Sequence, residues 1–235
     1  MYKEFAEVYD LIYASIDYKK SCKKLFKLIK KYKISPGNKL LDVACGTGSH
    51  LYYLQDDFIC TGVDINTDML EIAKQKVKNC EFIQADMISM NLNIKFDVIT
   101  CLFSSIGYVK TYENLKETIR NFSNHLNIGG IIVIEPWLTK SVYRVGFPSM
   151  TTYDREDIKI ARLNTTNLKD DLSTMEMHYL MVKKDEEVKY FKGYHELGLF
   201  DTDKTIEIMK KANFEVKSFE KGLMVDRGIF IGIKK

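Results

Sequence analysis

Hydrophobic residues follow two alternating patterns along this chain. Stretches with helical spacing separate short apolar runs. Strands that are apolar on both faces belong in a covered parallel sheet, since a half-exposed strand would alternate polar and apolar residues. Segments 67–78, after a candidate cap at Asn66, and 113–125, before two glycines, are predicted helices. The apolar runs span residues 38–44, 58–64, 80–86, 96–103 and 129–137. This alternation predicts an α/β fold with a doubly wound, mostly parallel sheet.

The flanks of this core have different patterns. Residues 19–33 have apolar side chains at helical spacing with lysines on the other face, which predicts an amphipathic helix with a solvated lysine face. Residues 172–184 and 187–199 predict two antiparallel strands joined by a charged turn, an insertion over the carboxyl edge of the sheet. A helix at about 203–213 and a final strand pair complete seven strands.

Composition narrows the protein class. The chain has 235 residues, 46% of them hydrophobic, which suits one domain with a sizeable core. A net charge of +3 is too small to indicate a nucleic-acid partner. The sequence contains no run of eighteen apolar residues, so no membrane span is predicted. Five cysteines without a C-x-x-C pair fit neither a zinc site nor a disulfide framework. We therefore expect a cytoplasmic protein without a bound metal.

Candidate ligand contacts follow the first three strands. Gly46 and Gly48 form a turn where backbone can approach a ligand, although two glycines alone also fit a simple tight turn. Leu51 stands where a dinucleotide fingerprint requires a third glycine, and this counts against a nicotinamide-dinucleotide site. Asp64 ends the second strand, where a carboxylate accepts hydrogen bonds from ribose hydroxyls. Asp86 and the next residue, at the end of the third strand, suit an adenine.

Three segments that carry these residues resemble motifs of the class I S-adenosylmethionine-dependent methyltransferases: LDVACGTGSH, GVDINTDML and QADM. Five others resemble the N,N-dimethyltransferases that act on TDP-linked amino sugars, such as those of desosamine and mycaminose: MYKEFAEVYDLIY, LFSSIGYVKTYENL, IIVIEPW, MEMHYL and DRGIFIGI. The likeness runs from residue 1 to the last strand. It implies a Rossmann-like methyltransferase fold and S-adenosylmethionine as the cofactor.

The resemblance also implies which residues bind the cofactor. Tyrosines of the amino terminus would fold over it and meet its methionine carboxylate. Family members carry a Gly-Arg-Gly-Lys run where this chain has residues 14–17 without an arginine, so Lys19 or Lys20 is a candidate replacement charge. The expected cofactor-binding residues are Tyr13, Tyr18, Ala44, Cys45, Gly46, Asp64, Ile65, Met69, Asp86, Met87, Phe103 and Ser104.

The acceptor site follows from the same resemblance. Tyr108 occupies a position where the family has His or Tyr, and we expect it to hold the acceptor amine. Arg227 matches a family arginine near the TDP moiety, and an arginine fork suits a pyrophosphate. His195 is a weaker pocket candidate, while His125 and Cys101 are predicted to be structural. The expected substrate-binding residues are Tyr9, Glu135, Trp137, His178 and Arg227; for Tyr9, Trp137 and Tyr108, simple packing is the alternative.

The sequence thus predicts a small-molecule methyltransferase that N-methylates a TDP-amino sugar and works mainly by positioning the amine. Another small amine or hydroxyl acceptor, a nicotinamide-dependent reductase and a noncatalytic binding module are the alternatives. One domain, residues 1–235, is expected, with cap helices in 1–34, a cofactor-binding core in 35–137, the insertion in 138–200 and the final helix and strand pair in 201–235. A homodimer through the inserted strands is a further hypothesis.

Overall fold

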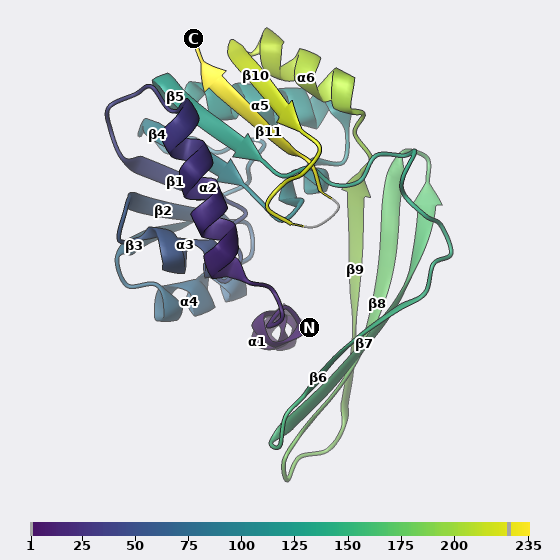
Figure 1. The fold of residues 1–235 in the computed structure, drawn as a ribbon. Coiled ribbons are helices and arrows are strands. Elements are labelled where there is room, and N and C mark those ends of the chain that lie inside the picture. The colour runs from purple at the N-terminus through teal and green to yellow at the C-terminus, as the bar shows by residue number, and fades with distance from the viewer. Residues whose placement is uncertain (1, 225–226) are drawn as a thin grey trace.

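The computed structural model describes residues 2–224 and 227–235, with the backbone alone for residues 2–5 and 7 (Figure 1). Its helices are α1 (Tyr2–Ile12), α2 (Tyr18–Tyr32), α3 (Ser49–Leu54), α4 (Thr67–Lys76), α5 (Tyr112–Asn124) and α6 (Thr202–Lys211), with a 3₁₀ helix η1 (Ser105–Val109). Its strands are β1 (Lys39–Val43), β2 (Ile59–Asp64), β3 (Cys80–Gln84), β4 (Phe96–Cys101), β5 (Leu126–Ile134), β6 (Ser149–Asp154), β7 (Ile158–Lys169), β8 (Leu172–Lys183), β9 (Lys189–Gly198), β10 (Phe214–Phe219) and β11 (Ile229–Lys234). The predicted helices and strands of the core are confirmed.

A seven-stranded sheet forms the centre of the molecule, in the order β10-β11-β5-β4-β1-β2-β3. Strands β1 to β5 are parallel, and β11 and β10 add antiparallel strands at one edge. The predicted doubly wound, mostly parallel sheet is confirmed. The strand order reverses between β1 and β4, and in open α/β sheets ligands bind at the carboxyl ends of the strands beside such a reversal.

Helices cover both faces of this sheet (Figure 1). Leu25 of α2 and Leu51 of α3 share one buried cluster with strand residues such as Leu40, whereas Leu115 of α5 and Met209 of α6 belong to the other cluster. The register of each strand therefore decides which side chains face which helical layer.

The helix cap predicted from the sequence at Asn66 has a clear physical basis. The side chain of Asn66 accepts hydrogen bonds from the amides of Asp68 and Met69, so helix α4 begins where the cap predicts. Asp17, Thr111 and other polar residues cap further helices in the same way. Among the described residues, no helix is long and apolar enough to span a membrane.

The insertion is a separate antiparallel sheet in the order β6-β7-β8-β9 that extends away from the central sheet (Figure 1). The sequence predicted β8 and β9 but missed β6 and β7, because the polar run of β7 from Asn164 to Lys169 hides its alternation. Met175, Met177 and Tyr179 of β8 pack with Val8 and Ile12 of α1. The insertion and α1 thus form a joint cover.

Candidate active site

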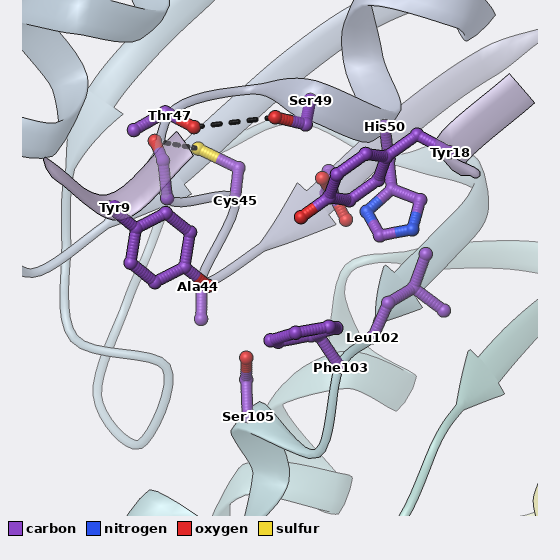
Figure 2. A pocket seen from close by; sticks show the side chains of 12 residues that line it. Tyr9, Tyr18, Ala44, Cys45, Thr47, Ser49, His50, Leu102, Phe103 and Ser105 are labelled. Carbon is purple, nitrogen blue, oxygen red and sulfur yellow. Dashed lines mark hydrogen bonds between the residues drawn. The ribbon is translucent and has the colours of Figure 1, made fainter. Parts of the chain in front are cut away.

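A cavity opens at the carboxyl ends of β1 and β4, with about 380 Å³ of empty space when its open mouth is included. Figure 2 shows that the rings of Tyr9, Tyr18 and Phe103 and the hydroxyl of Ser105 surround a common space. The lining residues come from α1, α2, β1, the glycine turn, the start of α3 and the segment after β4: Tyr9, Tyr18, Asp42, Ala44, Cys45, Gly46, Thr47, Ser49, His50, Leu102, Phe103 and Ser105.

The glycine turn forms one wall of this cavity. Ala44, Gly46 and Gly48 all have positive φ, at 55°, 55° and 75°. A Cβ added to Gly46 would meet nothing within 4 Å, so this glycine leaves open space beside the cavity, whereas one added to Gly48 would lie 3.2 Å from Val77. Gly46 thus permits close approach of a ligand, and Gly48 permits close packing of the turn on α4.

Two carboxylates stand next to the turn. Asp64, at the end of β2, accepts hydrogen bonds from the amides of Gly46 at 2.8 Å and Asn66 at 2.9 Å. Asp42, in β1, lines the cavity, is 2% exposed and accepts a 2.7 Å bond from the Thr100 hydroxyl. Burial raises the pKa of Asp42 to about 7 and also raises that of Asp64. A cationic ligand would favour the ionised form of Asp42.

The predicted adenosine contacts lie beyond the cavity, along the ends of β2 and β3. Asp86 accepts a bond from the amide of Ile88, and Met87 is half-buried against the core. Ile65 is 66% exposed, while Met69 is buried at the start of α4. Asp64 pairs with Gln84 in the β2–β3 register, so these residues occupy one edge of the sheet.

The amino-terminal tyrosines cover the cavity. The ring of Tyr13 contacts those of Tyr9 at 4.8 Å and Phe103 at 5.0 Å between centroids, and Tyr18 contacts His50 at 5.0 Å. Burial raises the pKa values of Tyr9 and Tyr18 and lowers that of His50 to about 4. At neutral pH these side chains are therefore uncharged hydrogen-bonding groups.

A polar cluster fastens α1 beside the cavity. The ammonium of Lys76 contacts Asp10 of α1 at 2.5 Å, Thr47 at 3.0 Å and Ser49 at 3.1 Å. Thr47 also donates to Asp10 at 2.6 Å. Lys19 and Lys20, the candidate replacements for the family arginine, are exposed and do not line the cavity. Lys76 is the cation that contacts two lining residues.

The segment after β4 is held in an unusual conformation. Phe103 and Ser104 have φ values of 54° and 65°, and backbone of this kind persists only where its surroundings fix it. The Phe103 amide donates to Glu135 at 3.0 Å, and Ser104 donates to the Pro136 carbonyl at 2.8 Å. Ser105 lines the cavity, whereas Ser104, a predicted contact, points to Pro136. This loop is thus preorganised by β5.

The residues predicted to bind the acceptor occupy several places. Glu135 is 1% exposed and accepts bonds from the amides of Phe103 and Met224, so both its oxygens serve the protein backbone. The guanidinium of Arg227 lies 4.1 Å from the ring centre of Trp137, which lines a second cavity. His178 contacts Tyr190 on the strand face opposite Tyr179, and this position does not support an acceptor contact.

Tyr108 and His195 come together across the chain. The Tyr108 hydroxyl in η1 lies 2.6 Å from Nδ1 of His195 in β9, and the two residues are 87 positions apart. Burial, and then the charge of Arg162, lower the pKa of His195. Arg162 also donates to the hydroxyl of Tyr13 at 3.1 Å. The insertion therefore contributes to the site around Tyr108.

Several lining residues were not predicted from the sequence. Asp42 interrupts an apolar strand, a signal that a charged group there serves a purpose. Thr47, Ser49 and His50 directly follow the glycine turn, so their position in the motif is the signal. Leu102 and Ser105 flank predicted residues. His125 and Cys101 are structural as predicted: His125 bonds to the Asn121 carbonyl and the Leu92 amide, and Cys101 is buried.

The residues present fit S-adenosylmethionine. The open side of Gly46 leaves room for a ligand, and the Asp42 and Asp64 carboxylates suit a cationic centre and ribose hydroxyls. Phe103 and the tyrosines provide apolar walls. Among the described residues, no group of three or more His, Cys, Asp or Glu side chains is arranged to hold a metal.

Comparisons with known proteins agree with this site. Residues 40–130 match the model of a methyltransferase domain. The chain is 31% identical, over 98% of both chains, to dTDP-3-amino-3,4,6-trideoxy-alpha-D-glucopyranose N,N-dimethyltransferase of Streptomyces venezuelae.

Solved structures show the same relationship. The crystal structure of Streptomyces venezuelae DesVI superimposes with a TM-score of 0.92 at 30% identity, covering 98% of each chain. CalS10, an amino pentose methyltransferase of Micromonospora echinaspora solved with S-adenosylmethionine bound, has the same fold, with a TM-score of 0.86, 23% identity and 97% coverage of both chains. The chain therefore belongs to the S-adenosylmethionine-dependent methyltransferases and, within them, to the family of the dTDP-amino-sugar N,N-dimethyltransferases.

Proposed function

We propose that this methyltransferase transfers the methyl group of S-adenosylmethionine to the amino nitrogen of a TDP-linked amino sugar. The observation that carries the proposal is the extent of the likeness to the Streptomyces venezuelae N,N-dimethyltransferase, which covers 98% of the chain. This likeness includes the four-stranded sheet and the segment around Tyr108. A likeness limited to the cofactor-binding core would not indicate which acceptor the protein methylates.

The proposed roles divide along the sheet edge. We assign the cofactor contacts to the predicted residues Tyr13, Tyr18, Ala44, Cys45, Gly46, Asp64, Ile65, Met69, Asp86, Met87 and Phe103, together with Asp42, Thr47, Ser49, His50 and Ser105 of the cavity wall. Ser104 would act through its bond to the Pro136 carbonyl, which holds the loop. Tyr9, Trp137 and Arg227 would serve the acceptor, with the Arg227 guanidinium as the proposed contact of a diphosphate. Glu135 would act by holding the Phe103 loop.

Methyl transfer from a sulfonium to an amine requires little acid or base catalysis by the protein. The bound cofactor supplies a methyl group on a sulfonium, whose sulfur is a good leaving group. Positioning of a neutral amine can contribute on the order of 7–11 kcal/mol to lowering the barrier. Tyr108, at the end of the preorganised loop after β4, is the residue we assign to hold that amine.

A product assay tests the proposal. The protein is incubated with S-adenosylmethionine and a panel of TDP-amino sugars that differ in amine position, and products are weighed by mass spectrometry. We expect mass gains of one or two methyl groups on a TDP-amino sugar, and none on the matching sugars with a hydroxyl in place of the amine. Methylation of the hydroxyl sugars alone would refute the proposal.

We also propose a homodimer through the outer face of the four-stranded sheet. Met150, Leu163, Leu180 and Tyr190 are 47–68% exposed there, on neighbouring strands. Clustered exposed apolar side chains of this kind favour a protein partner. Sedimentation should give twice the chain mass, and a double replacement of Leu163 and Leu180 by Glu should give a monomer; a monomeric unmodified protein would refute the dimer.

A reducing compartment such as the cytoplasm is the proposed location. All five cysteines are free thiols, and burial raises the pKa of each, including Cys22 to about 12. Protonated, buried thiols react slowly, and structural disulfides are rare where thiols stay reduced.

A further inference from the structure

The contact between Tyr108 and His195 has a consequence for which amines the site accepts. A tyrosine hydroxyl has one hydrogen to donate and two lone pairs that accept. Its oxygen lies 2.6 Å from Nδ1 of His195, a distance typical of a strong hydrogen bond. The remaining hydrogen-bonding capacity of the Tyr108 hydroxyl therefore depends on which of the two atoms carries the shared hydrogen.

The surroundings of His195 favour the neutral ring. It faces the inside of the insertion, near the guanidinium of Arg162 and the ring of Tyr179. Both desolvation and the Arg162 charge lower the pKa of His195, and desolvation raises that of Tyr108. A neutral imidazole has one donor and one acceptor nitrogen, and when its proton is on Nε2, a protonated phenol beside Nδ1 donates its hydrogen to that nitrogen.

Tyr108 also stands in a segment that borders the cofactor cavity. It lies in η1, directly after the loop of Phe103 and Ser105 that lines the cavity. Ser105 lines the cavity and begins η1, and residues three apart in a 3₁₀ helix share a face, so Tyr108 lies on the same face of η1 as this lining residue. An amine facing the cavity would meet the lone pairs of the Tyr108 oxygen.

We propose that His195 carries its proton on Nε2 and so fixes the Tyr108 hydroxyl as a hydrogen-bond acceptor toward the cavity, and that this restricts the acceptor site to amines that still carry an N–H. The inference rests on the proposed function, since it concerns the amine of that reaction. His195 is a positioning residue here, because it acts through Tyr108.

This arrangement limits the number of methyl groups added. Each transfer forms an N–C bond and breaks the methyl–sulfur bond, whose electron pair stays on sulfur, while one nitrogen proton leaves to water. A primary amine has two N–H groups and a secondary amine has one, so both can donate to Tyr108. A neutral tertiary amine has only a lone pair, which meets the lone pairs of the oxygen, so the site disfavours it.

Binding of matched amines tests the proposal. The protein saturated with S-adenosylhomocysteine is titrated calorimetrically with the monomethyl and dimethyl forms of one TDP-amino sugar, at a pH above the pKa of both amines. We expect the monomethyl form to bind about tenfold more tightly, the effect of about one hydrogen bond. In His195→Leu and in Tyr108→Phe the ratio should fall to about twofold or less.

Controls separate this role from a structural one. His195→Gln keeps an acceptor oxygen and should retain part of the preference. Tyr190→Phe removes the hydroxyl of a similar pair, 2.7 Å from Nδ1 of His178 on the outer sheet face, and should keep the full ratio. The proposal would be overturned if His195→Leu and Tyr108→Phe both bind S-adenosylhomocysteine normally and both keep the wild-type ratio of monomethyl to dimethyl affinity.

If no TDP-amino sugar binds, the proposed function is refuted, and the titration no longer tests the role of His195. A second measurement tests that role without a sugar. Nitrogen-15 NMR of the histidine rings distinguishes an unprotonated from a protonated Nδ1. We expect the His195 signal, assigned by its loss in His195→Leu, to show an unprotonated Nδ1 at neutral pH. A protonated Nδ1 would mean that the Tyr108 oxygen accepts from His195, which contradicts the proposal.

Discussion

Replacing Asp42 by Asn should make the protein more stable and its cofactor binding weaker. The carboxyl is 2% exposed, and burial raises its pKa to about 7. Its unfolded pKa is about 3.9, so the native state binds more protons between about pH 4 and pH 7. Stability is therefore lost as the pH rises through that interval.

The size of the effect follows from this shift. A pKa raised by about three units, at about 1.4 kcal/mol per unit, means that Asp42 lowers the free energy of unfolding by about 4 kcal/mol at pH 8. At pH 5 it lowers that free energy by only about 1.5 kcal/mol. The side-chain amide introduced by D42N would keep an oxygen for the Thr100 hydroxyl, which now donates to Asp42 at 2.7 Å. We expect D42N to melt about 5–15 °C higher at pH 8, with a smaller gain at pH 5.

Binding should change in the opposite direction. Asp42 lines the cavity, so loss of its charge removes a charge-assisted contact with a cationic cofactor, an effect of about 10- to 100-fold in Kd. Thermal unfolding at pH 5 and pH 8, with calorimetric titration of S-adenosylhomocysteine, measures both effects.

The matched control is another buried carboxylate. Asp97 is 3% exposed and accepts bonds from the Lys39 amide and the Asn127 side chain, and it does not line the cavity. Asp97→Asn should lower stability by about 1–2 kcal/mol and leave cofactor binding unchanged. A D42N protein that is less stable than wild type at pH 8, or whose gain is the same at pH 5, would refute the reasoning.

Three other changes probe the walls of the site. Lys76→Met should weaken cofactor binding about three- to tenfold because Asp10 of α1 loses its contact with Lys76, whereas Lys74→Met, which breaks the exposed pair with Glu71 on the same helix, should have no effect in the same titration. Gly48→Ala should lower stability by about 1–3 kcal/mol in thermal unfolding, since its φ is 75° and the new Cβ would crowd Val77; an unchanged melting temperature would show that the turn adapts. Glu135→Ala should cost about 2–5 kcal/mol in denaturant unfolding because two part-buried amides lose their acceptor, and a cost below about 1 kcal/mol would mean that water replaces the carboxylate.

Local sequence patterns determined the sheet and its helices. The apolar runs of β1 to β5 and the Asn66 cap are readable because each depends on residues a few positions apart. Strand β7 was missed for the same reason: Leu168 is the one apolar side chain in its second half, residues 164–169, which is too few to show an alternation, and pairing with β6 and β8 decides its structure.

The glycine turn and Asp64 could be located from the sequence because the carboxyl ends of neighbouring parallel strands must meet at one edge. Contacts between distant segments could not. Lys76 meets Asp10 across 66 positions and His195 meets Tyr108 across 87, and only the packing of α1 and the insertion onto the core brings them together. Side-chain pairing at that separation depends on loop geometry and strand register, which hydrophobic periodicity does not encode.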